Sequence, residues 1–183
     1  LKHFLWQNIF TMGFANWQFF KIVWKYINWD IKNVFEVWCA PGNYLISFHK
    51  KYGLNVWGVE YSKIWVESTY KNLSNQWISG EIVHNDFFDE NFMNKNSGRY
   101  DFVYSLWFIE HFDDVKMVVD RHFKLTKLWG IVVIVIPNLT GLNRFFSSSK
   151  KIEIHNTDIM NLRSLESIFS AYEVLEMRYY WWI

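Results

Sequence analysis

The sequence predicts an α/β fold: a doubly wound, mostly parallel sheet with helices on both faces. Strand-length apolar runs alternate with helix-length amphipathic segments from about residue 31 to residue 138, as expected for such a sheet. The run from Asn33 to Val37 ends in small residues at 39–42 and leads directly into a helical pattern, which is typical of a buried strand, a tight turn and a helix. A length of 183 residues with 51% hydrophobic and 20% charged residues fits one globular domain.

The N-terminal segment carries a broad apolar stripe that predicts a helix ahead of the first strand. We expect this helix to belong to a cover of residues 1–30 that packs over the ligand cleft. Its apolar residues recur at helical spacing: Phe14, Phe19, Phe20, Ile22, Val23 and Tyr26.

The remaining elements follow in order along a single domain of residues 1–183. Residues 31–138 should form the ligand-binding core, with strands over 32–37, 54–60, 81–84, 100–106 and 130–136. Helices are expected over 42–52, from an N-cap at Ser62 to residue 75, and from Asp113 onward. The continuous β-branched run at 130–136 is typical of a central strand. Residues 139–183 should supply a polar substrate lid over 139–157, a last helix over 162–169 and a sixth strand over 172–180.

Charge and cysteine content narrow the classes of function. The formal net charge is +1 and the basic residues are scattered, which disfavours nucleic acid as a partner. The single cysteine, Cys39, allows no disulfide framework and no Cys/His zinc spacing, so we expect a reducing, cytoplasmic setting and no metal. No apolar run approaches the roughly 18 residues of a membrane span, and no signal peptide is visible. The start at Leu1 favours a fragment.

Acids at the ends of successive predicted strands indicate a nucleotide site. Glu36 lies near the end of the first strand, Glu60 ends the second, and Asp86 follows the third. An acid at the end of the second strand, in the window of about 20 residues that dinucleotide-binding folds use, can hold two ribose hydroxyls. Glu60 alone would suit a solvated strand end, and Asp86 alone would suit a turn.

With these motifs the chain resembles the class I S-adenosylmethionine-dependent methyltransferases, which have a Rossmann-like fold. Their first motif is an acid, an apolar residue and Gly-x-Gly-x-Gly; here Trp38 and Ala40 replace the first two glycines, and Gly42 is kept. The resemblance implies that Glu60 binds the ribose, that Asp86 contacts the adenine amino group and that Phe87 packs on the adenine ring. It assigns these residues to the cofactor site: Glu36, Trp38, Ala40, Gly42, Glu60, Tyr61, Asp86, Phe87 and Ser105.

The segment Phe108 to Phe112 is similar to the Glu-His segment that follows strand four in many small-molecule methyltransferases. It makes His111 a candidate general base and Glu110 its neighbour, since His is suited to proton transfer near neutral pH. Both could instead only shape the pocket wall. Tyr104 and His155 are weaker candidates. The motif of amino-methylating nucleic-acid enzymes is absent after this strand, so a small-molecule acceptor is expected.

Tryptophan is unusually frequent, with 12 Trp against 8 Gly. Several tryptophans stand where glycine is expected: Trp29, Trp38, Trp77, Trp107 and Trp129. UGA is read as glycine in some genetic codes and as tryptophan in another. We therefore interpret these residues as glycine codons translated with the wrong code, although ordinary core or interface aromatics are the plainer alternative. Trp181 and Trp182 include a candidate for a genuine tryptophan.

Two other functions stay open at this point. A nicotinamide-dependent oxidoreductase would share the strand, turn, helix and Glu60, but its fingerprint does not require Glu36. A degenerate, non-catalytic binding module would explain Trp38 and Trp107 taken literally. The seventh, antiparallel strand of the family has no candidate in this chain, so the sheet should lack it. The sequence predicts neither the acceptor nor the oligomeric state.

Overall fold

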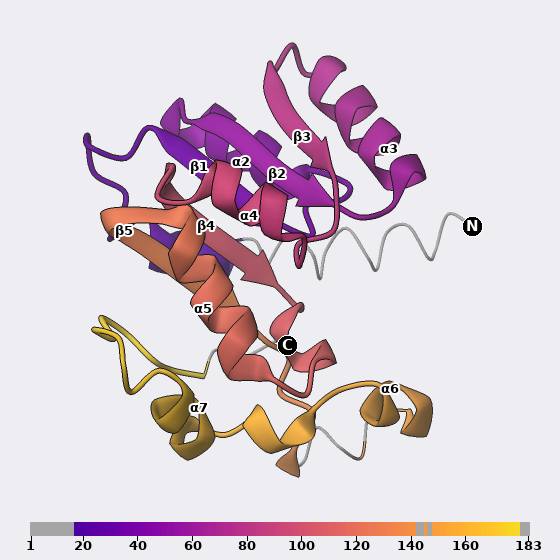
Figure 1. Cartoon of the computed structure of the whole chain (residues 1–183), viewed down its shortest axis with the longest axis vertical. Coiled ribbons are helices and arrows are strands. Elements are labelled where there is room, and N and C mark those ends of the chain that lie inside the picture. The colour runs from indigo at the N-terminus through magenta and orange to yellow at the C-terminus, as the bar shows by residue number, and fades with distance from the viewer. Residues whose placement is uncertain (1–16, 142–144, 146–147, 180–183) are drawn as a thin grey trace.

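A computed structural model describes residues 17–141, 145 and 148–179. Its sheet has five parallel strands in the order β3-β2-β1-β4-β5. The order reverses direction between β1 and β4, and helices lie on both faces (Figure 1). In sheets of this kind the ligand crevice lies outside the carboxyl ends of the strands at that reversal. The predicted fold class, a Rossmann-like α/β sheet, is confirmed.

Strands and helices alternate along the chain as predicted. The strands are β1 (Asn33–Val37), β2 (Asn55–Glu60), β3 (Gly80–His84), β4 (Tyr100–Leu106) and β5 (Thr126–Val135). The helices are α2 (Asn43–Tyr52), α3 (Lys63–Ser74), α4 (Glu90–Asn96), α5 (Val115–Leu125), α6 (Ser149–Glu153) and α7 (Leu162–Ile168). Short 3₁₀ turns, η1 (Ile109–His111) and η3 (Thr157–Ile159), complete the set. Helix α4 was not predicted.

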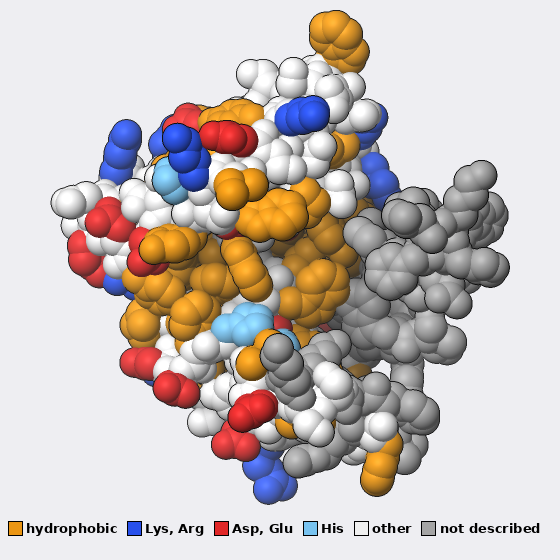
Figure 2. Space-filling model, turned by 90° about the vertical axis from the view of Figure 1, so that its right-hand side faces the viewer, with side chains coloured by type: hydrophobic (Ala, Val, Ile, Leu, Met, Phe, Trp, Pro, Cys, Tyr) orange, Lys and Arg blue, Asp and Glu red, His pale blue; other side chains and the backbone are white. Residues whose placement is uncertain are grey.

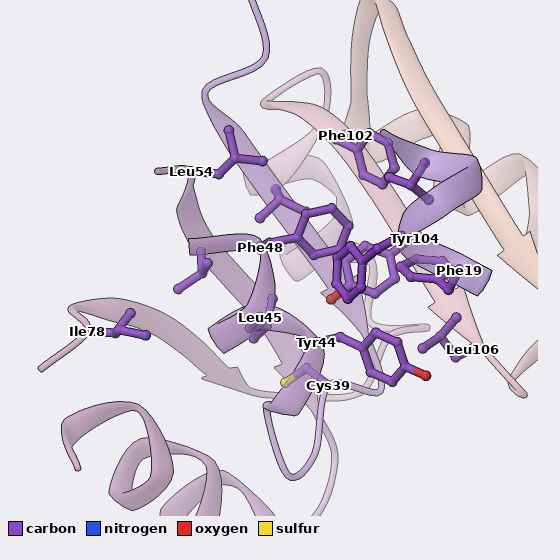
Figure 3. Close-up of a cluster of buried hydrophobic side chains, with 14 of the residues drawn as sticks. Phe19, Cys39, Tyr44, Leu45, Phe48, Leu54, Ile78, Phe102, Tyr104 and Leu106 are labelled. Carbon is purple, nitrogen blue, oxygen red and sulfur yellow. The ribbon is translucent and has the colours of Figure 1, made fainter. Parts of the chain in front are cut away.

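Side chains of alternate strand residues fill two cores, one on each face of the sheet. On one face α2, α3 and the helical residues 17–23 pack over the strands. There Phe19, Phe48 and Tyr104 lie together, with the Phe48 and Tyr104 rings 5.0 Å apart (Figure 3). On the other face α4 and α5 pack over residues such as Phe35 and Val103. The predicted N-terminal helix is confirmed from residue 17; Phe14 lies outside the described residues.

Two expectations about local structure were wrong. Residues 172–179 form no strand: the backbone bends at 172 and 175, the other residues have no regular structure, and Tyr172 stacks on Phe123 of α5, with ring centroids 3.7 Å apart. Strand β5 is the edge of the described sheet, not a central strand. Ser62 is the N-cap residue of α3, as predicted, but its side chain makes no capping hydrogen bond, and its backbone N–H donates to Glu60 Oε1 at 2.9 Å.

Among the described residues, the non-glycine residues with positive φ are all tryptophan: Trp38 (59°), Trp77 (58°), Trp107 (55°) and Trp129 (69°). A bulky residue is a genuine outlier in this left-handed region. Four of the five expected glycine-like positions therefore have the backbone that favours glycine. Trp29 is not among the residues with positive φ, so its turn does not need a glycine backbone.

No helix within the described ranges is both long and apolar enough to cross a bilayer.

Candidate cofactor and acceptor site

The turn after β1 brings the first motif against the end of β2. The backbone N–H groups of Trp38 and Cys39 both donate to the Val59 carbonyl, at 3.0 and 3.3 Å. Gly42, with φ of 87°, ends the turn at the N-terminus of α2. A Cβ on Gly42 would lie 2.8 Å from Thr69 Cγ2 of α3, so the turn requires both the left-handed backbone and the missing side chain.

Two buried carboxylates lie next to each other at the ends of β1 and β2. Parallel pairing aligns Glu36 with Gly58, two residues before Glu60. The two glutamates are 5% and 2% exposed, and Oε2 of each has no hydrogen-bond partner among the described residues. Burial raises the pKa of Glu36 well above its usual range; the Tyr104 hydroxyl lowers it, and the charge of Glu60 raises it further. Such unsatisfied acceptors are costly unless a ligand donates to them.

The third acid lies in the loop after β3 and behaves differently. Asp86 is exposed, and its Oδ1 accepts the backbone N–H of Phe88 at 2.8 Å, as in an Asx turn. Phe87 is 5% exposed and packs edge-on against Phe108, with ring centroids 5.4 Å apart. Of this predicted adenine pair, only the aromatic member is buried.

Aromatic rings connect the first motif to the segment after β4. The Trp38 ring lies 5.9 Å from Phe108 and 5.6 Å from His111. Trp38 is 47% exposed, so its indole lies at the mouth of the crevice rather than in the core. Figure 2, which looks onto the edge where the strands end, shows histidine side chains near the middle of this face with hydrophobic side chains next to them. Residues predicted from separate motifs thus meet on one face.

The Glu-His segment forms η1, and the chain around His155 packs against it. The Asn156 N–H donates to the Glu110 carbonyl at 2.7 Å, and its side chain donates to the Phe112 carbonyl at 3.3 Å. These bonds hold the His155 ring 4.6 Å from that of His111, measured between centroids. His111 Nδ1 also lies 3.3 Å from the Ile154 carbonyl oxygen.

Glu110 is completely buried, and neither of its carboxylate oxygens has a hydrogen-bond partner among the described residues. Burial raises its pKa to about 7, although its own backbone N–H lowers it. Burial also lowers the pKa of His111. This edge of the crevice therefore holds an acid that resists ionisation beside an imidazole that favours its neutral form.

The other predicted site residues have mixed positions. Ser105 is buried at the end of β4, level with Val37 of β1, and its Oγ has no partner among the described residues. Tyr61 is 73% exposed, although its carbonyl lies 3.0 Å from His84 Nε2. Ala40 lies within the β1–α2 turn. Phe108 also lies in the site but was not among the predicted site residues; its signal in the sequence was an aromatic residue two positions before Glu110.

A separate cavity of about 280 Å³ lies along β5, residues 17–26 and the C-terminal segment. Its lining includes none of the predicted cofactor or acceptor residues, so it is distinct from the crevice described above.

Comparisons with known proteins agree with the fold. A family model described as "Methyltransferase domain" matches residues 24–173. A SAM-dependent methyltransferase from Archaeoglobus fulgidus is 18% identical with a TM-score of 0.61, over 90% of this chain and 72% of that one. The PH0226 protein from Pyrococcus horikoshii OT3 is 18% identical with a TM-score of 0.60, over 80% and 61%.

The same comparisons limit what the fold implies. The [4+2]-cyclase SpnF has a TM-score of 0.50 at 11% identity, over 56% of this chain and 38% of that one, so the fold alone does not fix the reaction. The chain spans between 43% and 61% of the length of four of the solved structures. No curated protein matches it significantly by sequence.

The family match runs from the residues before β1 to those after α7, most of the described length, and the chain therefore belongs to the class I S-adenosylmethionine-dependent methyltransferases.

Proposed function

We propose that this chain binds S-adenosylmethionine, the cofactor of its family, and transfers the methyl group to a small-molecule acceptor. The observation that carries the proposal is the pair of buried acids, Glu36 and Glu60, at the strand ends beside the first-motif turn. The sheet edge at which they lie is the one that binds ligands in open α/β folds.

The residues fit the adenosine half of the cofactor. Glu60 keeps one oxygen, Oε1, occupied by the Ser62 N–H, while Oε2 has no described partner, so a ribose hydroxyl donating to it would satisfy a buried acceptor. Phe87 offers a buried ring beside the crevice on which adenine can pack. Asp86, with one oxygen engaged in its turn, contributes at most its second oxygen.

The first-motif turn does not fit the methionine half as the sequence stands. A glycine there would present its backbone to the ligand, whereas the Trp38 indole projects toward Phe108 and His111.

The acceptor side asks little of the protein beyond orientation and, for some acceptors, proton removal. S-adenosylmethionine supplies a methyl group on a good leaving group, so the protein mainly aligns the acceptor and excludes water. We assign the acceptor contacts to His111 and Glu110. For a hydroxyl or ammonium acceptor, a neutral His111 can take the proton.

Calorimetry with purified protein tests the proposal. We expect the Trp38→Gly variant to bind S-adenosylmethionine and to show no heat with NAD. Binding of NAD without binding of S-adenosylmethionine would refute the methyltransferase proposal in favour of the oxidoreductase alternative. Binding of the cofactor without turnover of any supplied hydroxyl or amine acceptor would favour the non-catalytic module.

A further inference from the structure

Three side chains from two segments of the chain lie close together on the acceptor side of the crevice. Glu110, His111 and His155 each offer one donor atom, and these atoms all lie within 4.8 Å of one another. A carboxylate and two imidazoles are the donor set of His₂Glu zinc sites and of related transition-metal sites that keep open coordination positions. We propose that Glu110, His111 and His155 bind a divalent transition-metal ion of the zinc class.

The burial of Glu110 is the independent observation that favours a cation here. Its side chain is wholly buried, one carboxylate oxygen lies within 4.8 Å of a ring nitrogen of each imidazole, and neither oxygen has a hydrogen-bond partner among the described residues. Buried carboxylates are normally paired, hydrogen-bonded or metal-bound. A cation between the three donors would give the Glu110 carboxylate the partner that it lacks among the described residues.

Hydrogen bonds made by residues outside the cluster hold the three candidate metal ligands close together. The two Asn156 bonds fix the His155 segment against η1, and the Ile154 carbonyl orients the His111 ring. Such outer contacts typically position metal ligands. Metal–donor distances of about 2.0 to 2.2 Å require the three groups to move closer, and His111, which is exposed, has room to turn.

A metal at this place would also define the class of acceptor. Three protein ligands leave open positions toward the crevice, where an acceptor oxygen could bind and lose its proton more readily. His111 would then be a ligand rather than a base. This extension to the acceptor rests on the proposed function, whereas the metal site itself does not.

The test titrates chelator-treated protein with Zn²⁺, and separately with Co²⁺ as a spectroscopic probe, without S-adenosylmethionine or acceptor. We expect one ion per chain and at least about tenfold weaker binding for Glu110→Gln and for His155→Ala. His84→Ala, which removes an exposed histidine of the same sheet edge, should bind as the parent does. Circular dichroism of each metal-free variant confirms folding.

No stoichiometric binding, or equal affinity in parent, Glu110→Gln and His155→Ala, would overturn the metal site. Neither result bears on cofactor binding, which is measured in the separate titration above.

The backbone at four tryptophans supports a second, independent inference. The four positive-φ tryptophans stand apart from the other side chains, since Asn and Asp, which tolerate this region best after glycine, supply none of the outliers among the described residues. Trp77 follows α3 at the position where a glycine ends many helices: Ile78 N–H donates to the Leu73 carbonyl, and Trp77 N–H to the Ser74 carbonyl, as in a Schellman motif.

Exposure supports the same conclusion. Trp77 and Trp129 are 95% and 90% exposed, so their indoles gain nothing from packing that would offset a strained backbone. We infer that positions 38, 77, 107 and 129 are glycine in the protein as its own cell makes it, through UGA codons read as glycine.

The nucleotide sequence and peptide mass spectrometry of the natively expressed protein decide this. We expect UGA at all four codons and glycine in all four peptides. UGG codons or tryptophan in those peptides would overturn the inference and make the strain a real property of the protein.

Discussion

The two sides of the crevice are built in different ways. On the cofactor side, the acids stand at strand ends, so that β1–β2 pairing alone aligns Glu36 with the residues before Glu60. On the acceptor side, Glu110 and His155 come from segments 45 positions apart that meet through backbone and Asn156 bonds. A regular sheet thus fixes the first group of residues, whereas irregular loops assemble the second, and loops are where related folds diverge.

His122 packs against Phe87 on the cofactor side and Phe108 on the acceptor side. Its protonation should produce the largest change in the free energy of unfolding. Its ring lies 5.1 Å from Phe87 and 6.1 Å from Phe108, and burial lowers its pKa from 6.5 to about 4. Between pH 6.5 and about pH 4, His122 is protonated in the unfolded chain and neutral in the folded chain. The contribution of His122 to stability should therefore be fully present above pH 6.5 and fall by about 3 kcal/mol as the pH drops toward 4, whereas the raised pKa of Glu110 changes stability in the opposite direction.

Urea unfolding of the parent and His122→Leu across this pH range checks the prediction. The difference in unfolding free energy between the two proteins should vary with pH, because the leucine variant lacks this titration. A constant difference would mean that another group causes any acid loss.

The next effect concerns the cofactor side alone. Glu60→Ala, made in the Trp38→Gly background, should weaken S-adenosylmethionine binding by about 1 to 3 kcal/mol, because ribose hydroxyls lose a charged acceptor. The exposed Glu67→Ala on α3 is the matched control and should leave affinity unchanged. Equal affinities for the Glu60 and Glu67 variants would show that Glu60 serves only the Ser62 turn.

The Trp38→Gly variant tests how strongly the Trp38 indole, which lies against residues of the acceptor side, weakens cofactor binding. The indole touches Phe108 and His111, so its removal should open the crevice and raise affinity for S-adenosylmethionine at least tenfold, about 1.4 kcal/mol or more. Calorimetric titration of the parent and variant side by side measures the change. Indistinguishable affinities would mean that the ring lies clear of the ligand.

The smallest expected effect is on the free energy of unfolding alone. It separates the backbone strain of a positive-φ tryptophan from any contact with the ligand. Trp77→Gly should raise the unfolding free energy by about 1 to 2 kcal/mol by relieving positive φ, and leave cofactor affinity unchanged. Trp29→Gly is the matched control, since Trp29 is also exposed in a turn, at 81%, but lacks positive φ. Thermal unfolding of both variants measures the change. If the two variants gained similar stability, the gain would come from removing an exposed indole rather than from relieving backbone strain.

Sequence periodicity was enough to predict every described strand and the α/β class, because a buried parallel sheet leaves continuous apolar runs. Glycine-like contexts likewise located Trp38 and Trp77 before their φ angles were known. The sequence could not show that residues 172–179 would pack by stacking Tyr172 instead of pairing as a strand. Nor could it bring His155 to Glu110, since a bond such as that from Asn156 to the Glu110 carbonyl leaves no periodic signal.

The place of β5 at the edge has a practical consequence for handling the protein. Its outer backbone groups pair with no other described strand, and the half-buried run Gly130–Ile134 is apolar and carries no charged side chain. An apolar, uncharged strand edge is a template for intermolecular pairing. Concentrated samples should therefore self-associate through β5, and replacing Val132 with lysine should keep the protein monodisperse in light scattering.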